Sequence, residues 1–188
     1  MKNISIFHPA TILSTFLWVG KIPFAPGSFG SLAAYPFTFL LINIANKLNH
    51  LLAKQSIVIP TLAITTILLI ILFLIGIWSS NVYVSKTNST DPGEIVIDEV
   101  VGQAIVIIAL LPVISEFNTI KQRAIVIISS FLLFRFFDIK KPWPINWFDQ
   151  NIKGGLGVML DDIIASVMAI IVFYVILFKL IDFQWVHL

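Results

Sequence analysis

The stretch Gly154 to Ala165, GGLGVMLDDIIA, combines three features that together point to a functional site. Three glycines fill four positions, two adjacent aspartates (Asp161 and Asp162) follow, and an uncharged apolar segment comes next. Glycine permits tight backbone curvature and close approach to a ligand. Carboxylates at the start of a membrane-like segment are costly and usually functional. We therefore expect a functional site at this stretch.

The composition predicts a membrane protein. Of the 188 residues, 58% are hydrophobic and 12% charged, whereas soluble domains are nearer 45–50% apolar and about 25% charged. The length suits a single domain over residues 1–188. The absence of cysteine excludes a thiol nucleophile, a disulfide framework and a cysteine-based metal site. A net charge of +2 is too small to indicate a nucleic-acid partner.

Apolar stretches predict about five spans and one short interfacial helix. The interfacial helix is expected from about Pro9 to Trp18. The five expected spans are Phe29–Asn46, Ile57–Trp78, Val100–Ser115, Ala124–Phe137 and Ile163–Phe178. A hydrocarbon core requires about 20 helical residues, and the third stretch alone reaches only about 24 Å. That helix must therefore begin in the preceding acidic run, with Asp98 and Glu99 near the membrane surface.

Two loops carry helix-start signals. The run KIPFAPGSFGS, Lys21 to Ser31, is rich in turn residues, and Ser28 or Ser31 could cap the next helix. Backbone N–H groups at such a start form an anion site, although an ordinary capped loop explains the same residues. Further along, Asp91 as N-cap with Glu94 at N3 has the pattern of a capping box, which could be all that these two acids do.

The distribution of basic residues predicts the orientation. If the spans pair as hairpins, three loops share one membrane face: Lys21–Ser28, Lys86–Glu99 and Arg135–Asp162. Together with Lys2 near the N-terminus, seven lysines and arginines then lie on this face and four on the other. An excess of positive charge marks the cytoplasmic side. The shared face is therefore expected to face the cytoplasm.

Acidic residues are concentrated on the same face. The first 90 residues contain no Asp or Glu, and nine of the ten acids fall between Asp91 and Asp162. The acids expected on the shared face are Asp91, Glu94, Asp98, Glu99, Asp138, Asp161 and Asp162. So many carboxylates require a cation, and hard oxygen ligands suit Mg²⁺, which commonly bridges to phosphate. A phosphorylated lipid is the expected substrate.

The neighbouring basic residues have two alternative roles each. Arg135, Lys140, Lys141 and Lys153 could bind phosphate. The lysines could instead meet anionic lipid headgroups, and Arg135 could pair with Asp138 three residues later. The glycines likewise indicate either approach of phosphate or metal to the backbone, or tight packing alone.

The absence of two catalytic motifs limits the mechanisms by which phosphate could be removed. His8, His50 and His187 lie outside the motif loops, and no Asp-x-Asp-x-Thr/Val sequence supports a phosphoaspartate route. A metal-activated water or an Asp nucleophile remains, and we favour the water. Adjacent helical residues point about 100° apart. Asp98 and Glu99, or Asp161 and Asp162, are therefore expected to have different partners unless the backbone is irregular there.

Four ordered blocks resemble the bacterial phosphatidylglycerophosphatase A family. They are PFAPGSFGSL (Pro23–Leu32), DPGEIVIDEVVGQ (Asp91–Gln103), FRFFDIKKPWPI (Phe134–Ile145) and GGLGVMLDDIIA. The resemblance implies a compact all-α bundle in the bacterial inner membrane. It also implies Mg²⁺-dependent removal of the terminal phosphate of phosphatidylglycerophosphate, which yields phosphatidylglycerol. In the first block, Ser28 stands where the family usually has Thr, and Ile22, just before it, replaces a frequent glycine.

The expected roles follow these blocks. Asp98, Glu99, Asp138, Asp161 and Asp162 would hold Mg²⁺ and orient or deprotonate the attacking water, with Glu94 as a further metal ligand. Ser28, Arg135, Lys140 and Lys141 would bind the substrate phosphate.

Two other classes fit part of the pattern. A small Mg²⁺-dependent lipid kinase or phosphatidyltransferase would need a second substrate, but the sequence has neither a P-loop nor an Asp-Gly-x₂-Ala-Arg signature. An ion-coupled transporter would place its carboxylates near mid-span, whereas these are expected at helix ends.

Overall fold

The computed structural model describes residues 4–56, 59–87 and 92–186, and over these residues all regular structure is helical. The elements are α1 (Pro9–Ser14), the 3₁₀ helix η1 (Val19–Lys21), α2 (Pro26–Ala53), α3 (Thr61–Thr87), α4 (Ile97–Glu116), α5 (Ile120–Lys140), α6 (Ile145–Asn151) and α7 (Gly154–Val186). The predicted all-α class is confirmed.

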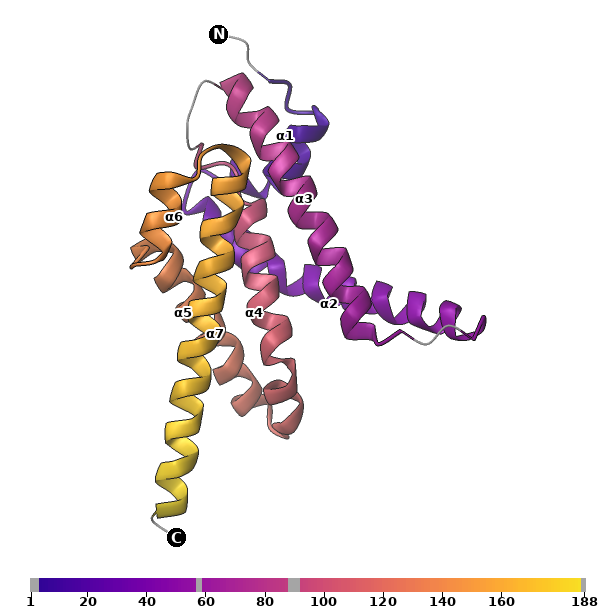
Figure 1. Cartoon of the computed structure of the whole chain (residues 1–188), viewed down its shortest axis with the longest axis vertical. Coiled ribbons are helices and arrows are strands. Elements are labelled where there is room, and N and C mark those ends of the chain that lie inside the picture. Colours follow the sequence, from indigo (N-terminus) through magenta and orange to yellow (C-terminus); the bar gives the residue numbers. More distant parts are fainter. Residues whose placement is uncertain (1–3, 57–58, 88–91, 187–188) are drawn as a thin grey trace.

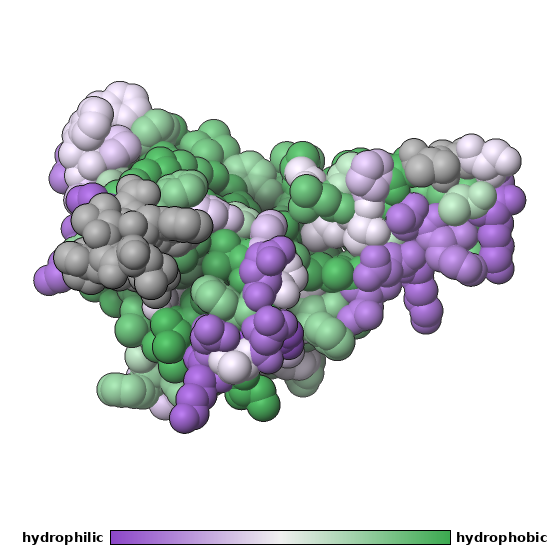
Figure 2. Space-filling model, turned by 90° about the horizontal axis from the view of Figure 1, so that it is seen from below, coloured by the Kyte–Doolittle hydropathy of each residue, from purple (hydrophilic) through white to green (hydrophobic). Residues whose placement is uncertain are grey.

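Within the described residues, four helices are long and apolar enough to cross a membrane: α2, α3, α4 and the Gly154–Lys179 part of α7. The remaining expected span, Ala124–Phe137, corresponds to α5, which carries charged residues near both ends. Seen from below, hydrophobic side chains cover much of the middle of this face (Figure 2). Hydrophilic side chains gather around the α4–α5 turn and along the outer end of α2 and α3. Polar groups thus lie at helix ends, as a membrane protein requires.

Helix α4 is the centre of the bundle and packs against α2, α7 and α5 (Figure 1). Small residues allow this close approach: a Cβ at Gly102 would stand 2.8 Å from the Phe134 ring and 3.1 Å from the Asp162 carbonyl oxygen. The Ser166 hydroxyl donates to the Gly102 carbonyl across the same contact, at 2.8 Å. Small residues and interhelical hydrogen bonds are the usual basis of helix packing in membranes.

One end of the bundle collects the segments that sequence analysis assigned to a shared face. In Figure 1, α1, α6 and the starts of α4 and α7 all lie toward the upper end, where the end of α3 also lies. Lys21 of η1 reaches Glu94 before α4, and Lys86 of α3 lies 3.2 Å from the His8 ring. The prediction that these loops meet is confirmed.

Several predicted helix boundaries are wrong. Helix α2 begins at Pro26, with Ala25 at the N-cap and no side-chain cap, so neither Ser28 nor Ser31 caps it. Helix α4 begins at Ile97 with Val96 at the N-cap. Glu94 therefore lies before the helix and is not at its N3 position; the other residue of the expected capping box, Asp91, lies outside the described residues.

The C-terminal half also differs from expectation. The loop expected from Ile139 to Trp147 instead contains the end of α5 and the start of α6, which the sequence did not predict. The last helix begins at Gly154, nine residues before the expected start at Ile163. The glycines are thus the first turn of α7, and Asp161 and Asp162 lie two turns inside it.

Candidate functional site

Asp98 and Glu99 lie in the first turn of α4. The preceding residue Val96 donates its backbone N–H to the Ser14 carbonyl oxygen at 2.9 Å, which ties this helix start to α1. Unpaired backbone N–H groups and the helix dipole favour negative charge in a first turn. The fold therefore supports two carboxylates at this position.

Asp162 of α7 joins these two acids. One carboxylate oxygen from each of Asp98, Glu99 and Asp162 lies within 4.8 Å of the other two. Asp98 and Glu99 thus converge despite being adjacent, contrary to the expectation from helix geometry. Asp162 is 3% exposed, and Ser166 donates to its backbone carbonyl at 2.6 Å.

These carboxylates have unsatisfied oxygens. Within the described part of the chain, Asp98 Oδ1, Glu99 Oε2 and Asp162 Oδ2 are buried and have no hydrogen-bond partner. Buried polar groups without partners are rare and costly, and those that persist usually have a ligand or a catalytic role. Three converging hard oxygens suit a divalent cation such as Mg²⁺. The residues present therefore fit the metal that the sequence predicts.

Arg135, near the end of α5, faces the acids of two helices. Its Nη1 donates to Asp138 Oδ2 in the same helix and lies 3.6 Å from Glu99 Oε1 of α4. All three side chains are 13–14% exposed. The expected pairing of Arg135 with Asp138 is present, and the same guanidinium also faces Glu99, one of the three converging carboxylates.

Lys141 makes a second ion-pair system with α6 and α7. Its Nζ lies 2.7 Å from Asp149 Oδ1 and 2.5 Å from Asp161 Oδ2. Partial burial lowers the pKa of the Lys141 ammonium, but the hydrogen bonds to Asp149 and Asp161 outweigh that effect and raise the pKa above its ordinary value. Lys141 therefore carries a positive charge at neutral pH. Asp161 pairs with Lys141, whereas Asp162 belongs to the three-carboxylate group, so the two adjacent aspartates have different partners, as expected.

A cavity of about 510 Å³ connects both ion-pair systems. Its charged lining comprises Asp98, Glu99, Asp138, Asp149, Asp161, Asp162, Arg135, Lys141 and Lys153. Gly93, Gly154 and Gly157 also line it. The cavity thus offers carboxylates for a cation and cations for an anion in one shared space.

Three residues that the sequence assigned to the site do not line this cavity. Glu94 Oε2 instead pairs with Lys21 Nζ at 2.6 Å and accepts a hydrogen bond from Tyr83. Burial raises the pKa of Glu94, but those contacts outweigh it and hold that pKa below its ordinary value. Ser28 lies in the first turn of α2 outside the lining, and Lys140 is exposed.

The glycines of α7 have two separate roles. Gly155 packs on α3: its N–H donates to Asn81 Oδ1 at 2.6 Å, and a Cβ there would stand 2.2 Å from the Ile77 carbonyl oxygen. Gly154 adopts a φ of +73°, a conformation that glycine adopts without strain, and also lines the cavity. Both expected roles of the glycines are therefore present: Gly155 allows close packing, and Gly154 lies at the cavity.

The sequence did not single out Asp149, Asn81 or Gly27. Asp149 belongs to the unpredicted helix α6, so only its membership in the acidic run could have indicated it. Gly27 lies in the block Pro23–Leu32, where only Ser28 was given a role, and Asn81 lies in none of the four blocks. Their contacts arise where α2 meets α4 and where α3 meets α7.

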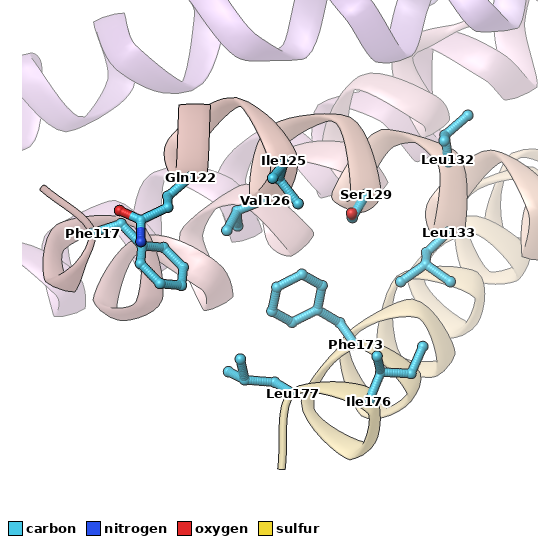
Figure 3. Close-up of a pocket in the computed structure, with 10 residues that line it drawn as sticks. All are labelled: Phe117, Gln122, Ile125, Val126, Ser129, Leu132, Leu133, Phe173, Ile176 and Leu177. Atoms are coloured by element: carbon cyan, nitrogen blue, oxygen red, sulfur yellow. The ribbon is translucent and has the colours of Figure 1, made fainter. Parts of the chain in front are cut away.

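A second hollow, of about 410 Å³, lies between α5 and α7 toward the other end of the bundle (Figure 3). Phe173 of α7 points toward Val126 and Ser129 of α5, and Gln122 and Ser129 are the polar residues of its lining. It has no charged side chain in its lining and therefore offers no group for phosphate or metal.

Together these features define an integral membrane enzyme of the all-helical class, whose acidic cavity lies at one end of the bundle. Residues 12–177 match the family model described as phosphatidylglycerophosphatase A. The chain belongs to the phosphatidylglycerophosphatase A family and is accordingly a phosphatase, a hydrolase of phosphoric monoesters.

Curated relatives agree over most of their length. The chain is 31% identical to phosphatidylglycerophosphatase A of Escherichia coli (strain K12), over 92% of this chain and 86% of the relative. It is 32% identical to the Haemophilus influenzae protein of that name, over 94% and 93%. A Bacteroides thetaiotaomicron protein, provisionally named a phosphatidylinositol-3-phosphatase, is 38% identical over 85% and 88%. No solved structure matches the chain.

Proposed function

We propose that the protein hydrolyses the terminal phosphate monoester of phosphatidylglycerophosphate to phosphatidylglycerol and phosphate, with Mg²⁺ as cofactor. The observation that carries the metal proposal is the convergence of Asp98, Glu99 and Asp162, whose buried oxygens lack partners among the described residues. The substrate follows from the names of two relatives that are aligned over nearly the whole chain.

The site residues would divide the work as follows. Asp98, Glu99 and Asp162 would hold the cation. When bound, Mg²⁺ supplies positive charge to phosphoryl oxygens and acidifies water. Arg135 and Lys141 line the cavity and would contact the phosphoryl oxygens, where charge shifts in the transition state. Asp138 and Asp161 would accept hydrogen bonds from the attacking water and fix its direction.

The reaction needs no second substrate. The oxygen of water forms a bond to phosphorus while the bond from phosphorus to the glycerol oxygen breaks. One proton of water passes to a cavity carboxylate, and this proton then passes to the glycerol oxygen as it leaves, which restores the carboxylate. The in-line geometry depends on how firmly the cations hold the phosphoryl group, because positioning supplies much of the rate enhancement in phosphoryl transfer.

Phosphate release from purified full-length protein in detergent tests this proposal. Phosphatidylglycerophosphate should be hydrolysed with Mg²⁺, and EDTA should stop the reaction. Phosphatidylinositol 3-phosphate should be assayed beside it, because one relative is named for that lipid; a preference for this lipid would replace the proposed substrate. Full activity in the double variant Asp161→Asn, Asp162→Asn would contradict the assignment of these residues.

We further propose that the cavity faces the cytoplasm in the bacterial inner membrane. The chain has no cysteine, so single cysteines can report sidedness without a background. Asn151→Cys, on exposed α6, should react with an impermeant thiol reagent in inverted inner-membrane vesicles. Gln55→Cys, after α2, should react in right-side-out vesicles. The reverse pattern would overturn the orientation.

A further inference from the structure

Lys141 lies at the point where α5 ends and the chain reverses toward α6. Its backbone adopts φ 42° and ψ 53°, and its N–H donates to the Phe137 carbonyl oxygen at 2.8 Å. Glycine is the residue that fits such a left-handed helix end without steric cost. A lysine held in this conformation suggests that its side chain does something glycine could not do.

The ammonium of Lys141 lies between two carboxylates that come from different elements. Asp149 of α6 is 2.7 Å from Nζ, and Asp161 of α7 is 2.5 Å from it. Two oxygen ligands at such distances around one positive centre resemble the surroundings of a bound cation. This centre is distinct from the Asp98–Glu99–Asp162 group, because Asp161 and Asp149 are not members of that group.

Asp149 is fixed in turn by its own helix. Ile145, at the start of α6, is fully buried in the core, which anchors this short helix against the bundle. Lys153 Nζ donates to the Asp149 backbone carbonyl at 3.1 Å. The Asp149 carboxylate therefore meets the cavity from a defined direction, although its side chain is 42% exposed.

We propose that Lys141 is a built-in second cation of the active site and that Asp149 is the positioning residue that holds it against Asp161. The site would then bind one divalent ion, at Asp98, Glu99 and Asp162. An ammonium has three donors, and Asp149 and Asp161 use two of them. The third would serve a phosphoryl oxygen of the substrate. This inference rests on the proposed function and adds to it the metal count and the role of Asp149.

Counting bound Mn²⁺ on the full-length protein in detergent tests the metal count without any assay of activity. Electron paramagnetic resonance titration should give one ion per wild-type chain. In Lys141→Met, Asp149 and Asp161 lose the ammonium, and a second, weaker ion should bind. Two ions on the wild-type chain, or a single ion on Lys141→Met, would overturn the inference. No bound ion on the wild type would instead contradict the metal of the proposed function.

Kinetics test the positioning role of Asp149. Asp149→Asn should lower kcat about 10-fold with KM nearly unchanged, because Asp149 acts through Lys141 and not on the substrate. Lys141→Met should lower kcat by about 10²–10³, and Lys141→Arg, which can also bridge two carboxylates, should recover most of that loss. Wild-type kcat in Asp149→Asn, or no recovery in Lys141→Arg, would overturn the positioning role.

Two matched variants control for general effects of removing charge. Lys121→Met removes a lysine at the other end of α5, and Glu116→Gln removes an exposed acid at the far end of α4. Both should keep one Mn²⁺ per chain and the wild-type kcat. A second ion or a comparable loss of kcat in these controls would show that the effects do not depend on the Lys141 contacts, and would overturn the inference.

Discussion

The backbone of Gly27 lies directly against the Glu99 carboxylate. A Cβ at residue 27 would stand 2.0 Å from Glu99 Oε1 and 3.1 Å from both terminal nitrogens of Arg135. The first turn of α2 thus closes one side of the contact between Glu99 and Arg135. The glycine-containing loop before α2 therefore bears on the site through packing against a carboxylate, and Ser28, the hydroxyl in that loop, lies outside the cavity lining.

Gly27→Ala should reduce activity while the protein still folds. The added methyl group must push either Glu99 away from the three-carboxylate group or α2 away from α4. Misplacement of a catalytic group by about 1 Å can cost about 10²-fold in rate, and we expect a loss of kcat of about that size. Steady-state kinetics with phosphatidylglycerophosphate provide the measurement. Leu32→Ala, on the exposed side of the same helix, is the control; equal kcat values in the two variants would contradict this view of Gly27.

Asp161→Asn and Asp162→Asn should differ in their response to Mg²⁺. A ligand that binds only the folded state stabilises it, by about 2.7 kcal/mol at 100 times its Kd. Because Asp162 belongs to the three-carboxylate group and Asp161 pairs with Lys141, Mg²⁺ should raise the Tm of Asp161→Asn but not that of Asp162→Asn. Thermal unfolding in detergent, with and without EDTA, gives the comparison. A Mg²⁺-dependent rise in the Tm of Asp162→Asn would remove this residue from the metal site.

The pair formed by Lys21 and Glu94 should stabilise the protein over a defined pH range. Burial opposes both charges, yet their mutual contacts lower the pKa of Glu94 and raise that of Lys21. Because the pKa of Glu94 is lower in the folded than in the unfolded protein, this group stabilises the folded state at pH values above its unfolded pKa of 4.5. This stabilisation is lost as the pH falls through the folded pKa. A raised lysine pKa gives stability below 10.5, and this stability is lost as the pH rises further.

Glu94→Gln should therefore lower the free energy of unfolding between about pH 5 and pH 10, and the difference from wild type should shrink below pH 4.5. Because both side chains are partly exposed, we expect a loss of up to about 1 kcal/mol. Unfolding measured across this pH range tests the expectation. The double variant Lys21→Met, Glu94→Gln should lose little more than either single variant; additive losses would show that the two residues do not act as a pair.

The sequence could predict the parts of this structure that depend on composition and pattern. Long apolar stretches determine the helices, and the clustering of acids after Asp91 indicated one acidic end of the bundle. Patterns of short range were less reliable. Glu94 was expected to take part in a capping box. It pairs instead with Lys21, a residue 73 positions earlier in the chain.

The dependence on contacts between distant residues also explains which site residues the sequence did not indicate. Asp149 meets Lys141 only because the chain reverses in a left-handed conformation at Lys141 and then forms the short helix α6. Neither feature has a clear signal in the sequence. Asp98 and Glu99 were expected to diverge as neighbours on a helix. At the first turn of α4, however, their oxygens converge on Asp162, because flexible side chains can compensate for the angle between adjacent Cβ directions.

Gly155 provides the strictest test of how α7 is positioned. A Cβ there would stand 2.2 Å from the Ile77 carbonyl oxygen and 3.0 Å from the Asn81 nitrogen, and these backbone atoms of α3 cannot rotate away. Gly155→Ala should therefore force α7 from α3 and destabilise the protein by about 1–3 kcal/mol, the usual cost of overpacking.

Because Asp161 and Asp162 lie on the same helix, the shift of α7 in Gly155→Ala should also reduce kcat. Leu156→Ala, at an exposed neighbouring position, should change neither property. Asn81→Ala separates the two causes, because it removes the hydrogen bond to the Gly155 N–H without adding bulk. If the hydrogen bond alone matters, Asn81→Ala will match Gly155→Ala in both stability and kcat. If close packing sets the position of the two aspartates, Gly155→Ala will show the larger loss of kcat.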